Sequence, residues 1–376
     1  MATDVRPVAA GKSDDPRGWR EWWLDFRNRL IAKPSFQRWA AGFPLTRGVA
    51  RRRARALFDL VAGFVYAQVL AACVRLNLFE ILAEGPQSLA ELAPRLALSE
   101  AAAHRLLKAA AALELVERLP DGRHGLGHLG AALLGNPALP PMIAHHEMLY
   151  EDLADPVALL RGQSGATRLA EFWAYGKGDA APYSRLMAES QSLVAQEILD
   201  AYPLAGHRRL MDVGGGEGAF LSAAGSRHPR LELVLCDLPD VAKRGLRRLE
   251  AEGLGSRSTS AGRNFLTEPL PEGADIASLV RVLHDHDDAD AMLILRKVRA
   301  ALPSGGVLLV AEPMSGAPGA GPMGDAYFGF YLLAMGSGRP RTPKEISGML
   351  AEAGFSSSRL RRTRQPLVVQ VIAARV

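Results

Sequence analysis

The carboxyl-terminal half of the chain alternates between two patterns of hydrophobic and polar positions. Short apolar runs, which are typical of buried strands, occupy residues 208–213, 231–237, 274–283, 305–312 and 366–374. Longer segments with apolar residues at helical spacing lie between or near them, at residues 217–228, 240–254, 287–302 and 342–355. This alternation predicts an α/β fold, with a doubly wound, Rossmann-like sheet that binds ligands at the carboxyl ends of its strands.

The amino-terminal half is predicted to be mainly helical. Residues 57–82 predict one long helix, and its apolar stretch 56–74 is interrupted by Asp59 and Gln68. A membrane-spanning helix needs about 20 mostly apolar residues, so we favour a buried or dimer-forming helix. Within residues 88–133, Ser88 and Ser99 precede two helical patterns, and the turn sequence at 120–122 predicts a hairpin. Helix, turn, helix and hairpin in this order predict a winged-helix module.

The second helix of that module gives little support to nucleic-acid recognition. It is dominated by alanine and leucine and offers only His104, Arg105 and Lys108 to a phosphate backbone. A winged-helix DNA-binding regulator therefore stays an alternative, and we expect no nucleic-acid partner. The predicted organisation is a basic, tryptophan-rich extension at 1–56, a winged-helix-like dimerisation domain at 57–165 and a ligand-binding α/β domain at 166–376.

Positive charge is concentrated near the amino terminus. Residues 17–55 contain eleven Arg or Lys against two acidic residues, so they carry +9, whereas the whole chain carries +5 and the remainder about −4. Four of the five tryptophans lie in the same segment, at Trp19, Trp22, Trp23 and Trp39. Such a composition suits a helix lying on an anionic membrane. It equally suits a basic arm packed on a partner subunit, and the sequence leaves both open.

The cysteines and the first residues indicate the compartment. Cys73 and Cys236 are far apart in the sequence and have no metal-type spacing, as expected of two buried thiols in a reducing environment. The chain begins MATDVRPVAAGKSDD, without the apolar stretch of a secretory signal. We expect a cytoplasmic protein, peripheral on the inner or an intracytoplasmic membrane if the basic segment binds lipid.

A glycine-rich loop predicts the ligand of the α/β domain. In LMDVGGGEGAFL (210–221), Gly214, Gly216 and Gly218 follow the first predicted strand and allow the backbone to approach a ligand closely. A pyrophosphate would avoid nearby carboxylates, but Asp212 and Glu217 flank this loop. These carboxylates favour a cationic nucleoside, S-adenosylmethionine, over a dinucleotide. No G-K-[ST] sequence follows, which excludes a P-loop.

A carboxylate after the second strand extends this prediction. Asp237 lies in LVLCDLP, 23 residues after Gly214, where an acidic side chain can accept hydrogen bonds from ribose hydroxyls.

The segment RVLHDHDDADAM (281–292) contains two histidines and four aspartates. His284 and His286, two residues apart, would share one face of a strand, and a metal site would need a further ligand from elsewhere. We favour a catalytic base, because histidine titrates near neutrality. Asp287, Asp288 and Asp290 fit the cap and first turn of the following helix. No metal is expected.

These motifs together resemble the S-adenosylmethionine-dependent O-methyltransferase family that includes the plant caffeate and acetylserotonin enzymes. The resemblance covers roughly residues 57–376 and includes DVGGGEG, CDLP, RVLHDHDDADAM and LLVAEPM in the family's order. It implies a class I methyltransferase sheet, a homodimer, His284 as general base and Glu312 as the carboxylate that orients it. The cofactor-binding residues it implies are Asp212, Gly214, Gly216, Glu217, Gly218, Asp237, Leu238, Asn264, Phe265 and Arg281.

Three positions differ from the family pattern. Pro340 stands where the plant enzymes carry a second glutamate, which would leave Glu312 as the only orienting carboxylate. Arg263 replaces an acidic residue of the adenine-binding segment, so that only Asn264 and Phe265 are expected to contact adenine. His286 stands where the plant enzymes typically carry tryptophan, and it is either a helix-entry residue or a cofactor contact.

Within this family, residues 36–70 and LVRVLHDHDD are most similar to the carotenoid O-methyltransferases of purple photosynthetic bacteria. The resemblance implies an apolar acceptor, the tertiary hydroxyl of an acyclic carotenoid such as hydroxyneurosporene or demethylspheroidene, in spheroidene-type carotenoid biosynthesis. A phenolic, polyketide or tetrapyrrole acceptor is the alternative. Expected substrate contacts lie in the region between the two domains: His145, His146, Met148, Phe172, Trp173, Met187 and Ser190.

Overall fold

The computed structural model describes residues 18–173, 191, 193–316 and 321–376. The chain divides into two compact units, Met1–Ala72 and Cys73–Val376. The predicted substrate contacts Met187 and Ser190 lie outside the described residues.

The first unit consists of helices. These are α1 (Trp19–Ile31), α2 (Pro34–Gly42) and most of α3 (Arg47–Arg75). Helix α3 begins ten residues earlier than the sequence predicts and ends at Arg75, so the expected boundary between residues 56 and 57 falls inside one continuous helix. Its only described buried residue is Cys73, so of the two expected alternatives, a buried or a dimer-forming helix, the dimer-forming one stays a prediction. By length and composition alone, α3 could cross a membrane.

The second unit begins with the predicted winged-helix layout. Helix α4 (Leu78–Ala83) is followed by α5 (Leu89–Arg95), α6 (Glu100–Ala112), the hairpin strands β1 (Val116–Arg118) and β2 (His124–Leu126), and α7 (His128–Leu134). Ser88 and Glu91 form a capping box at the start of α5, and the Ser99 hydroxyl accepts a hydrogen bond from the Ala102 amide of α6. Both predicted helix starts are confirmed. Helices α8 (Leu139–Asp152), α9 (Pro156–Leu160) and α10 (Arg168–Trp173) follow.

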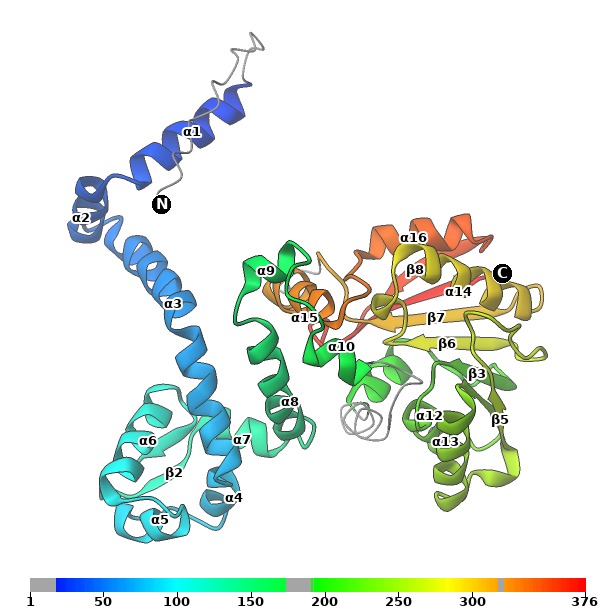
Figure 1. Ribbon diagram of the computed structural model, residues 1–376, viewed down its shortest axis with the longest axis horizontal. Helices are drawn as coiled ribbons and strands as arrows, with labels where there is room; N and C mark the ends of the chain where they lie inside the picture. The colour runs from blue at the N-terminus through cyan, green and yellow to red at the C-terminus, as the bar shows by residue number, and fades with distance from the viewer. Residues whose placement is uncertain (1–17, 174–190, 192, 317–320) are drawn as a thin grey trace. The chain divides into compact units, whose positions relative to one another are not determined.

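A seven-stranded sheet forms the centre of the described α/β region, in the order β5-β4-β3-β6-β7-β9-β8 (Figure 1). Its strands are β3 (Arg209–Val213), β4 (Glu232–Asp237), β5 (Ser258–Gly262), β6 (Ile276–Val280), β7 (Val307–Glu312), β8 (Ser357–Arg361) and β9 (Gln370–Arg375). The first five are parallel, whereas β9 is antiparallel to both β7 and β8. Because the chain order reverses between β3 and β6, a ligand crevice is expected at their carboxyl ends.

Helices connect and cover these strands. They are α12 (Ala219–Arg227), α13 (Pro239–Ala251), η1 (Gly255–Arg257), η2 (Leu283–Asp285), α14 (Asp288–Ala301), η3 (Pro322–Tyr327), α15 (Phe328–Met335) and α16 (Pro343–Glu352). The predicted strand 274–283 ends at Val280, so His284 lies in the turn η2 and not on a strand. His284 and His286 therefore do not share a strand face.

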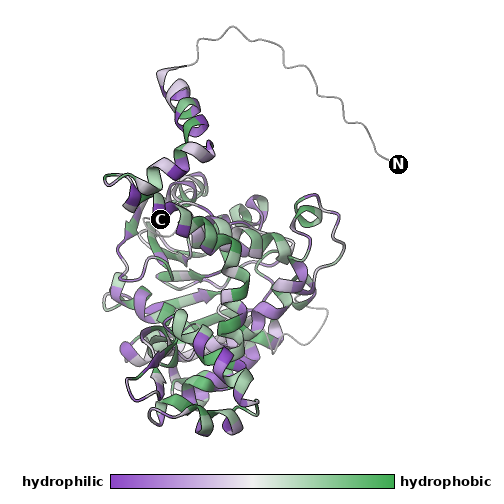
Figure 2. Ribbon diagram, turned by 90° about the vertical axis from the view of Figure 1, so that its left-hand side faces the viewer, coloured by the Kyte–Doolittle hydropathy of each residue, from purple (hydrophilic) through white to green (hydrophobic). Residues whose placement is uncertain are grey.

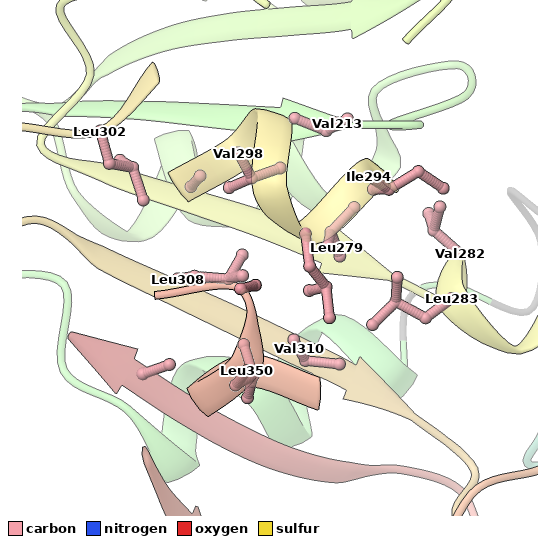
Figure 3. Packing of buried hydrophobic residues seen from close by; sticks show 14 of the residues in the cluster. Val213, Leu279, Val282, Leu283, Ile294, Val298, Leu302, Leu308, Val310 and Leu350 are labelled. Atoms are coloured by element: carbon pink, nitrogen blue, oxygen red, sulfur yellow. The ribbon is translucent and has the colours of Figure 1, made fainter. Parts of the chain in front are cut away.

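Alternate residues of the strands build two hydrophobic layers. Figure 3 shows one layer, in which Leu279 and Val310 of the sheet pack against Val298 of α14 and Leu350 of α16. The opposite layer includes Leu210 of β3 with Phe220 of α12 and Leu249 of α13. The strands are drawn mainly as hydrophobic segments in Figure 2. This two-sided burial holds the loops at the carboxyl ends of the strands in fixed positions.

Candidate functional site

A cavity of about 510 Å³ lies at the carboxyl ends of β3, β4 and β6. Its walls come from the loop after β3, the end of β4, residues 264–266 and the segment that follows β6. Ala170 and Trp173 of α10 and Met335 of α15 complete it. The position agrees with the crevice expected where the strand order reverses.

The loop after β3 is shaped by close approaches that a side chain would prevent. Gly214 has φ +73°, and a Cβ there would lie 2.8 Å from Val282 Cγ2. A Cβ on Gly215 would lie 2.7 Å from Asp212 Oδ2. Asp237 organises the same loop, because its carboxylate accepts hydrogen bonds from the Gly216 amide at 2.8 Å and the Leu238 amide at 2.7 Å.

Most of the residues predicted to bind the cofactor line this cavity. They are Gly214, Gly216, Glu217, Asp237, Leu238, Asn264, Phe265 and Arg281. Gly218 does not line it and instead precedes the first turn of α12. Asp212 does not line it either and is buried beneath the loop, so its predicted role in cofactor binding stays a prediction.

Asp212 is a buried carboxyl group with incomplete hydrogen bonding. Its Oδ1 accepts a hydrogen bond from the Ser278 hydroxyl at 2.6 Å, and its Oδ2 has no partner among the described residues. Burial raises the pKa of Asp212 to about 7, although the Ser278 hydrogen bond lowers it. Asp212 therefore places an oxygen that can accept a proton beneath the glycine loop, and it is not a permanent negative charge there.

Negative groups outnumber positive ones on the described part of the cavity wall. Glu217, Asp237 and Asp285 face it, against the single arginine Arg281. Burial raises the pKa of Asp237, while the amides of Gly216 and Leu238 oppose that rise. This charge distribution suits a cationic ligand and disfavours a pyrophosphate.

Arg281 departs from ordinary backbone geometry at the end of β6. Its φ of 57° is strained for a residue with a side chain. Its amide donates a hydrogen bond to Ala311 O at 2.8 Å, which ties this segment to β7. The chain then turns sharply into η2, which carries His284.

His284 is buried beside two carboxylates. Its Nε2 lies 2.9 Å from Asp285 Oδ1, and its Nδ1 lies 3.9 Å from Glu312 Oε2, which accepts the His284 backbone amide at 3.1 Å. Nδ1 and Glu312 Oε1 have no hydrogen-bond partner among the described residues. Burial lowers the pKa of His284, but Asp285 and then Glu312 outweigh it, so the net pKa is raised. Burial raises the pKa of Glu312.

The expectation that Glu312 is the only orienting carboxylate is wrong. Asp285, the residue after the histidine, is the nearer carboxylate. Asp285 and His286 also line the cavity, whereas His284 is only 5% exposed and lies behind them. The ring of His286 packs edge-on against Phe265, with 5.7 Å between centroids. Asp285 is therefore the group between the imidazole and the cavity.

A fully buried arginine holds the His284 segment in place. Arg341 Nη1 donates to Leu283 O at 2.7 Å, and its Nη2 donates to His286 O at 2.8 Å. Gly338 packs so closely that a Cβ there would lie 2.1 Å from His284 O. The Ser337 hydroxyl donates to Asp285 O at 2.9 Å. We call residues 337–341 the clamp segment. Pro340 in this segment is singled out by the sequence pattern, whereas Arg341 is not.

The aspartates after His286 also face the clamp segment. Asp287 occupies the cap position of α14 but makes no capping bond with its side chain; its Oδ1 accepts the Gly338 amide at 2.9 Å. Asp288 and Asp290 lie in the first turn, as predicted. Asp288 accepts hydrogen bonds from Arg341 and from Arg339. These acidic residues thus contribute to positioning the turn that carries His284.

A second group of aromatic side chains lies next to His284. His145 Nε2 and the Tyr331 hydroxyl are 2.9 Å apart, and His146 Nε2 and the Tyr327 hydroxyl are 2.7 Å apart. The ring of Phe328, which follows Tyr327, is 5.9 Å from the ring of His284. We call His145, His146, Tyr327, Phe328 and Tyr331 the aromatic wall.

The other predicted substrate contacts fall around this wall. Phe172 lies 5.0 Å from His145 between ring centroids, Trp173 lines the cavity, and Met148 is half-buried on the same helix as the two histidines. The sequence analysis missed Tyr327, Phe328 and Tyr331, although the aromatic-rich run AYFGFY could have indicated them.

Burial sets the ionisation of the aromatic wall. It lowers the pKa of His145 to about 4, with a smaller contribution from His146, and it also lowers the pKa of His146. It raises the pKa of Tyr331 to about 12 and that of Tyr327 as well. Both histidines and both tyrosines are therefore neutral at physiological pH, and the wall offers neutral hydrogen-bonding and apolar contacts.

Sequence and structure comparisons agree with this site. Residues 150–356 match an O-methyltransferase domain, and residues 58–135 match an O-methyltransferase dimerisation domain. The chain is 46% identical over 354 residues to the demethylspheroidene O-methyltransferase of Cereibacter sphaeroides, and the alignment covers 92% of this chain and 93% of that protein. It is 44% identical over 359 residues to the protein of the same name from Rhodobacter capsulatus, covering 93% and 89%.

A solved structure shares the fold. The methyltransferase CalO1 of calicheamicin biosynthesis, in an SAH-bound form, aligns with a TM-score of 0.74 and 28% identity over 86% of this chain and 98% of that chain. The family matches together span most of the second unit, including the cavity, the His284 turn and the tyrosines of the aromatic wall, whereas His145 and His146 lie between the two matched ranges. The chain belongs to the O-methyltransferase family and is an O-methyltransferase with that family's dimerisation domain.

Proposed function

We propose that this enzyme transfers a methyl group from S-adenosylmethionine to the tertiary hydroxyl at one end of an acyclic carotenoid, such as hydroxyneurosporene or demethylspheroidene. The two demethylspheroidene O-methyltransferases support this acceptor, since each aligns with more than nine-tenths of the chain. The observation that carries the mechanism is a buried histidine–carboxylate pair directly behind an acidic cavity. The reaction belongs to spheroidene-type carotenoid biosynthesis.

The residues of the cavity fit the proposed methyl donor. Glu217 and Asp285 provide negative charge for a cationic ligand, and Asp237 provides carboxylate oxygens for ribose hydroxyls. Phe265 lines the cavity close to Gly214 and offers an aromatic surface to a base. When bound, S-adenosylmethionine supplies a methyl group on a positively charged sulfur, which an oxygen nucleophile can displace.

His284 would accept the proton of the acceptor hydroxyl. Its Nε2 points to Asp285 on the cavity side, while its Nδ1 faces Glu312 on the buried side. In this structure Nε2 donates to Asp285, so the imidazole could act as a base only after Asp285 turns away from it. A proton on Nδ1, on the side of Glu312, would then leave Nε2 free to accept the hydroxyl proton. The raised pKa of His284 gives the imidazole a strong affinity for that proton.

The aromatic wall suits an apolar acceptor. Its histidines and tyrosines satisfy one another's polar atoms, so they present mainly ring surface. Phe328 connects this surface to His284. An acceptor with one hydroxyl on a long hydrocarbon chain would place the chain against the rings and the hydroxyl near His284.

The proposed acceptor also determines where the enzyme works. A long polyene dissolves in the bilayer and not in water, so the protein would be cytoplasmic and bound peripherally to the inner or an intracytoplasmic membrane. We propose a homodimer, because residues 58–135 match the family's dimerisation domain and α3 exposes a largely apolar surface within this chain.

The test is a defined acceptor panel. Purified full-length protein and labelled S-adenosylmethionine are mixed in detergent with a hydroxylated acyclic carotene, a phenol, a polyketide or a tetrapyrrole. We expect a methoxy product by mass spectrometry only with the carotene, and at least about a hundredfold less of it per unit time with the His284→Ala variant. A labelled phenolic, polyketide or tetrapyrrole product without a methoxycarotenoid would replace the proposed acceptor. Preference for NAD over S-adenosylmethionine in calorimetry would overturn the cofactor.

A further inference from the structure

We infer that α1 and α2 form an amphipathic anchor that lies in the plane of an anionic lipid surface. We call residues 19–43 the arm. The inference rests on the proposed function for its purpose, because a bilayer-dissolved acceptor requires the enzyme to reach the bilayer. Binding of the arm to lipid can be measured without any acceptor, so the two proposals can fail separately.

Helix α1 carries one continuous aromatic stripe. Trp19, Trp22, Trp23, Phe26 and Leu30 follow the i, i+3, i+4, i+7 and i+11 spacing of a single helix face. Trp19 is 75% exposed and Trp22 is 64% exposed, and no residue of α1 is buried. The rings of Trp22 and Phe26 stack with centroids 5.6 Å apart. Solvent-exposed aromatic surface of this extent indicates a partner that covers it.

Helix α2 and the residue after it carry a shorter aromatic stripe of the same kind. Phe36, Trp39 and Phe43 follow the i, i+3 and i+7 spacing, and their successive ring centroids lie 5.5 and 5.0 Å apart. Trp39 is exposed, as is Phe43. Pro34 begins this helix, and Ala32 and Lys33 connect it to α1. Two consecutive short helices thus each present an apolar, tryptophan-containing face.

The charges of α1 are arranged around its stripe. At 3.6 residues per turn, Arg20 and Arg27 lie on one flank of the stripe and Arg29 lies on the other. Glu21 and Asp25 lie toward the opposite side of the helix. Arginines beside the aromatic face would meet lipid phosphates while the rings enter the interface. The acidic residues would stay in water.

Charge and composition favour lipid over a protein partner. Residues 17–55 carry +9, which complements an anionic membrane surface. Tryptophan is characteristic of the membrane interface. The matched dimerisation domain begins at residue 58, after the arm.

Tryptophan emission can report this binding directly. The chain has five tryptophans, of which four lie in the arm and the fifth is Trp173. In a Trp173→Phe background every tryptophan therefore reports on the arm. We expect a blue shift and co-sedimentation with phosphatidylglycerol-containing vesicles, both reduced by salt. No shift and no salt-dependent sedimentation with these vesicles would overturn the inference.

Matched variants separate the contributions. Replacing Arg20, Arg27 and Arg29 with Gln should weaken binding to anionic vesicles roughly a hundredfold, at about fivefold for each arginine. The control variant Glu21→Gln/Asp25→Asn removes the two acidic charges of α1, including Asp25, which pairs with Arg29 at 3.2 Å, and should bind as well as or better than the parent. Replacing Trp19, Trp22 and Trp23 with Ser should abolish the blue-shifted, sedimenting state. Equal loss in the control variant would contradict the arrangement.

Two further measurements distinguish a lipid anchor from a contact between subunits. If the arm packs on a second copy of this chain, the three-tryptophan variant will raise the dimer dissociation constant in ultracentrifugation without vesicles, and the lipid inference fails. If the arm is an anchor, that variant should methylate a detergent-dissolved carotene as well as the parent does, but lose activity on the same carotene in vesicles. If the protein binds vesicles but methylates no carotene, the membrane-anchor inference would stand and the proposed acceptor would be refuted.

Discussion

Two buried histidines of this enzyme, His284 and His145, lie in regions with opposite effects on ionisation. His284 has Asp285 and Glu312 beside it, and its pKa is raised despite burial. His145 in the aromatic wall is paired with the Tyr331 hydroxyl, and burial lowers its pKa to about 4. The same side chain at similar burial thus gains affinity for a proton in one place and loses it in the other, because only carboxylates compensate the lost hydration of an imidazolium.

The two regions also differ in how their backbone is held. The turn around His284 receives hydrogen bonds from the clamp segment at Leu283, Asp285 and His286. The aromatic wall instead connects α8 with η3 and α15 through two side-chain pairs. A fixed, charged turn is suited to moving a proton, whereas a neutral aromatic surface is suited to receiving an apolar chain.

The largest expected effect is the loss of the base itself. His284→Ala should reduce kcat about a hundredfold to ten-thousandfold, while S-adenosylmethionine binding measured by calorimetry stays close to that of the parent. His145→Gln is the comparison variant, and it should mainly raise the KM for the acceptor. Near-parental turnover in His284→Ala would show that the proton leaves by another route.

Arg341 tests whether the turn must be held rigidly. Arg341→Met should lower kcat tenfold to a hundredfold, as expected when a catalytic group moves by about 1 Å, and Arg341→Lys should restore part of it. A shifted pH–rate profile would show that the lower kcat comes from a displaced His284 and not from a loss of folded protein. The control is Arg339→Met, because Arg339 is partly exposed and binds only the side chains of Asp288 and Glu345 among the described residues. An equal kcat loss in Arg339→Met would contradict the role of Arg341.

The carboxylates should set the pH dependence of the rate. A base acts when deprotonated, so activity rises as the pH passes the pKa of His284. Asp285→Asn removes the nearer charge that raises this pKa and should move the acidic limb of the profile to lower pH. Glu312→Gln should move it in the same direction but less, because Glu312 is 3.9 Å away and Asp285 is 2.9 Å away. A limb that moves to higher pH would reverse the assignment.

The sequence predicts the centre of the fold better than its edges. All five predicted strands correspond to β3, β4, β6, β7 and β9, because buried strands read as continuous apolar runs. The edge strands β5 (STSAG) and β8 (SSRLR) were missed, since each lies at the border of the sheet and is largely polar. Helix α15 was missed as well: its eight residues are apolar almost throughout, so they show no helical periodicity.

The same distinction applies to the site. The glycine loop, Asp237 and His284 follow strands directly, so their place at the carboxyl edge could be predicted from local order. Arg341 is 58 residues from Leu283, and Tyr331 is 186 residues from His145. Such pairs form only when the chain folds, and no local pattern distinguishes a buried arginine from an exposed one. Asp285 was missed as an orienting group for another reason: it is adjacent to His284, but its contact depends on the η2 turn.

The smallest expected effect concerns stability, and it compares the two regions directly. In the unfolded chain His145 would have a pKa near 6.5, against about 4 in the fold. The unfolded state therefore binds more protons between these values, and stability is lost as the pH falls through this window. At about pH 5 the loss is at most about 2 kcal/mol. In urea unfolding, the double variant His145→Phe/Tyr331→Phe should not show this loss of stability at acidic pH. The variant removes both polar groups of the pair, so neither is left without its partner.

His284 should show the opposite slope. Its folded pKa is raised, so its contribution to stability is fully present below the unfolded value and is lost as the pH rises through the folded one. The difference in unfolding free energy between the parent and His284→Ala should therefore shrink above neutrality. The difference in unfolding free energy between the parent and the aromatic-wall double variant should instead change on the acidic side of neutrality. If both differences changed in the same pH range, the carboxylates would not distinguish the two histidines, and the assignment of the base to His284 would lose its electrostatic basis.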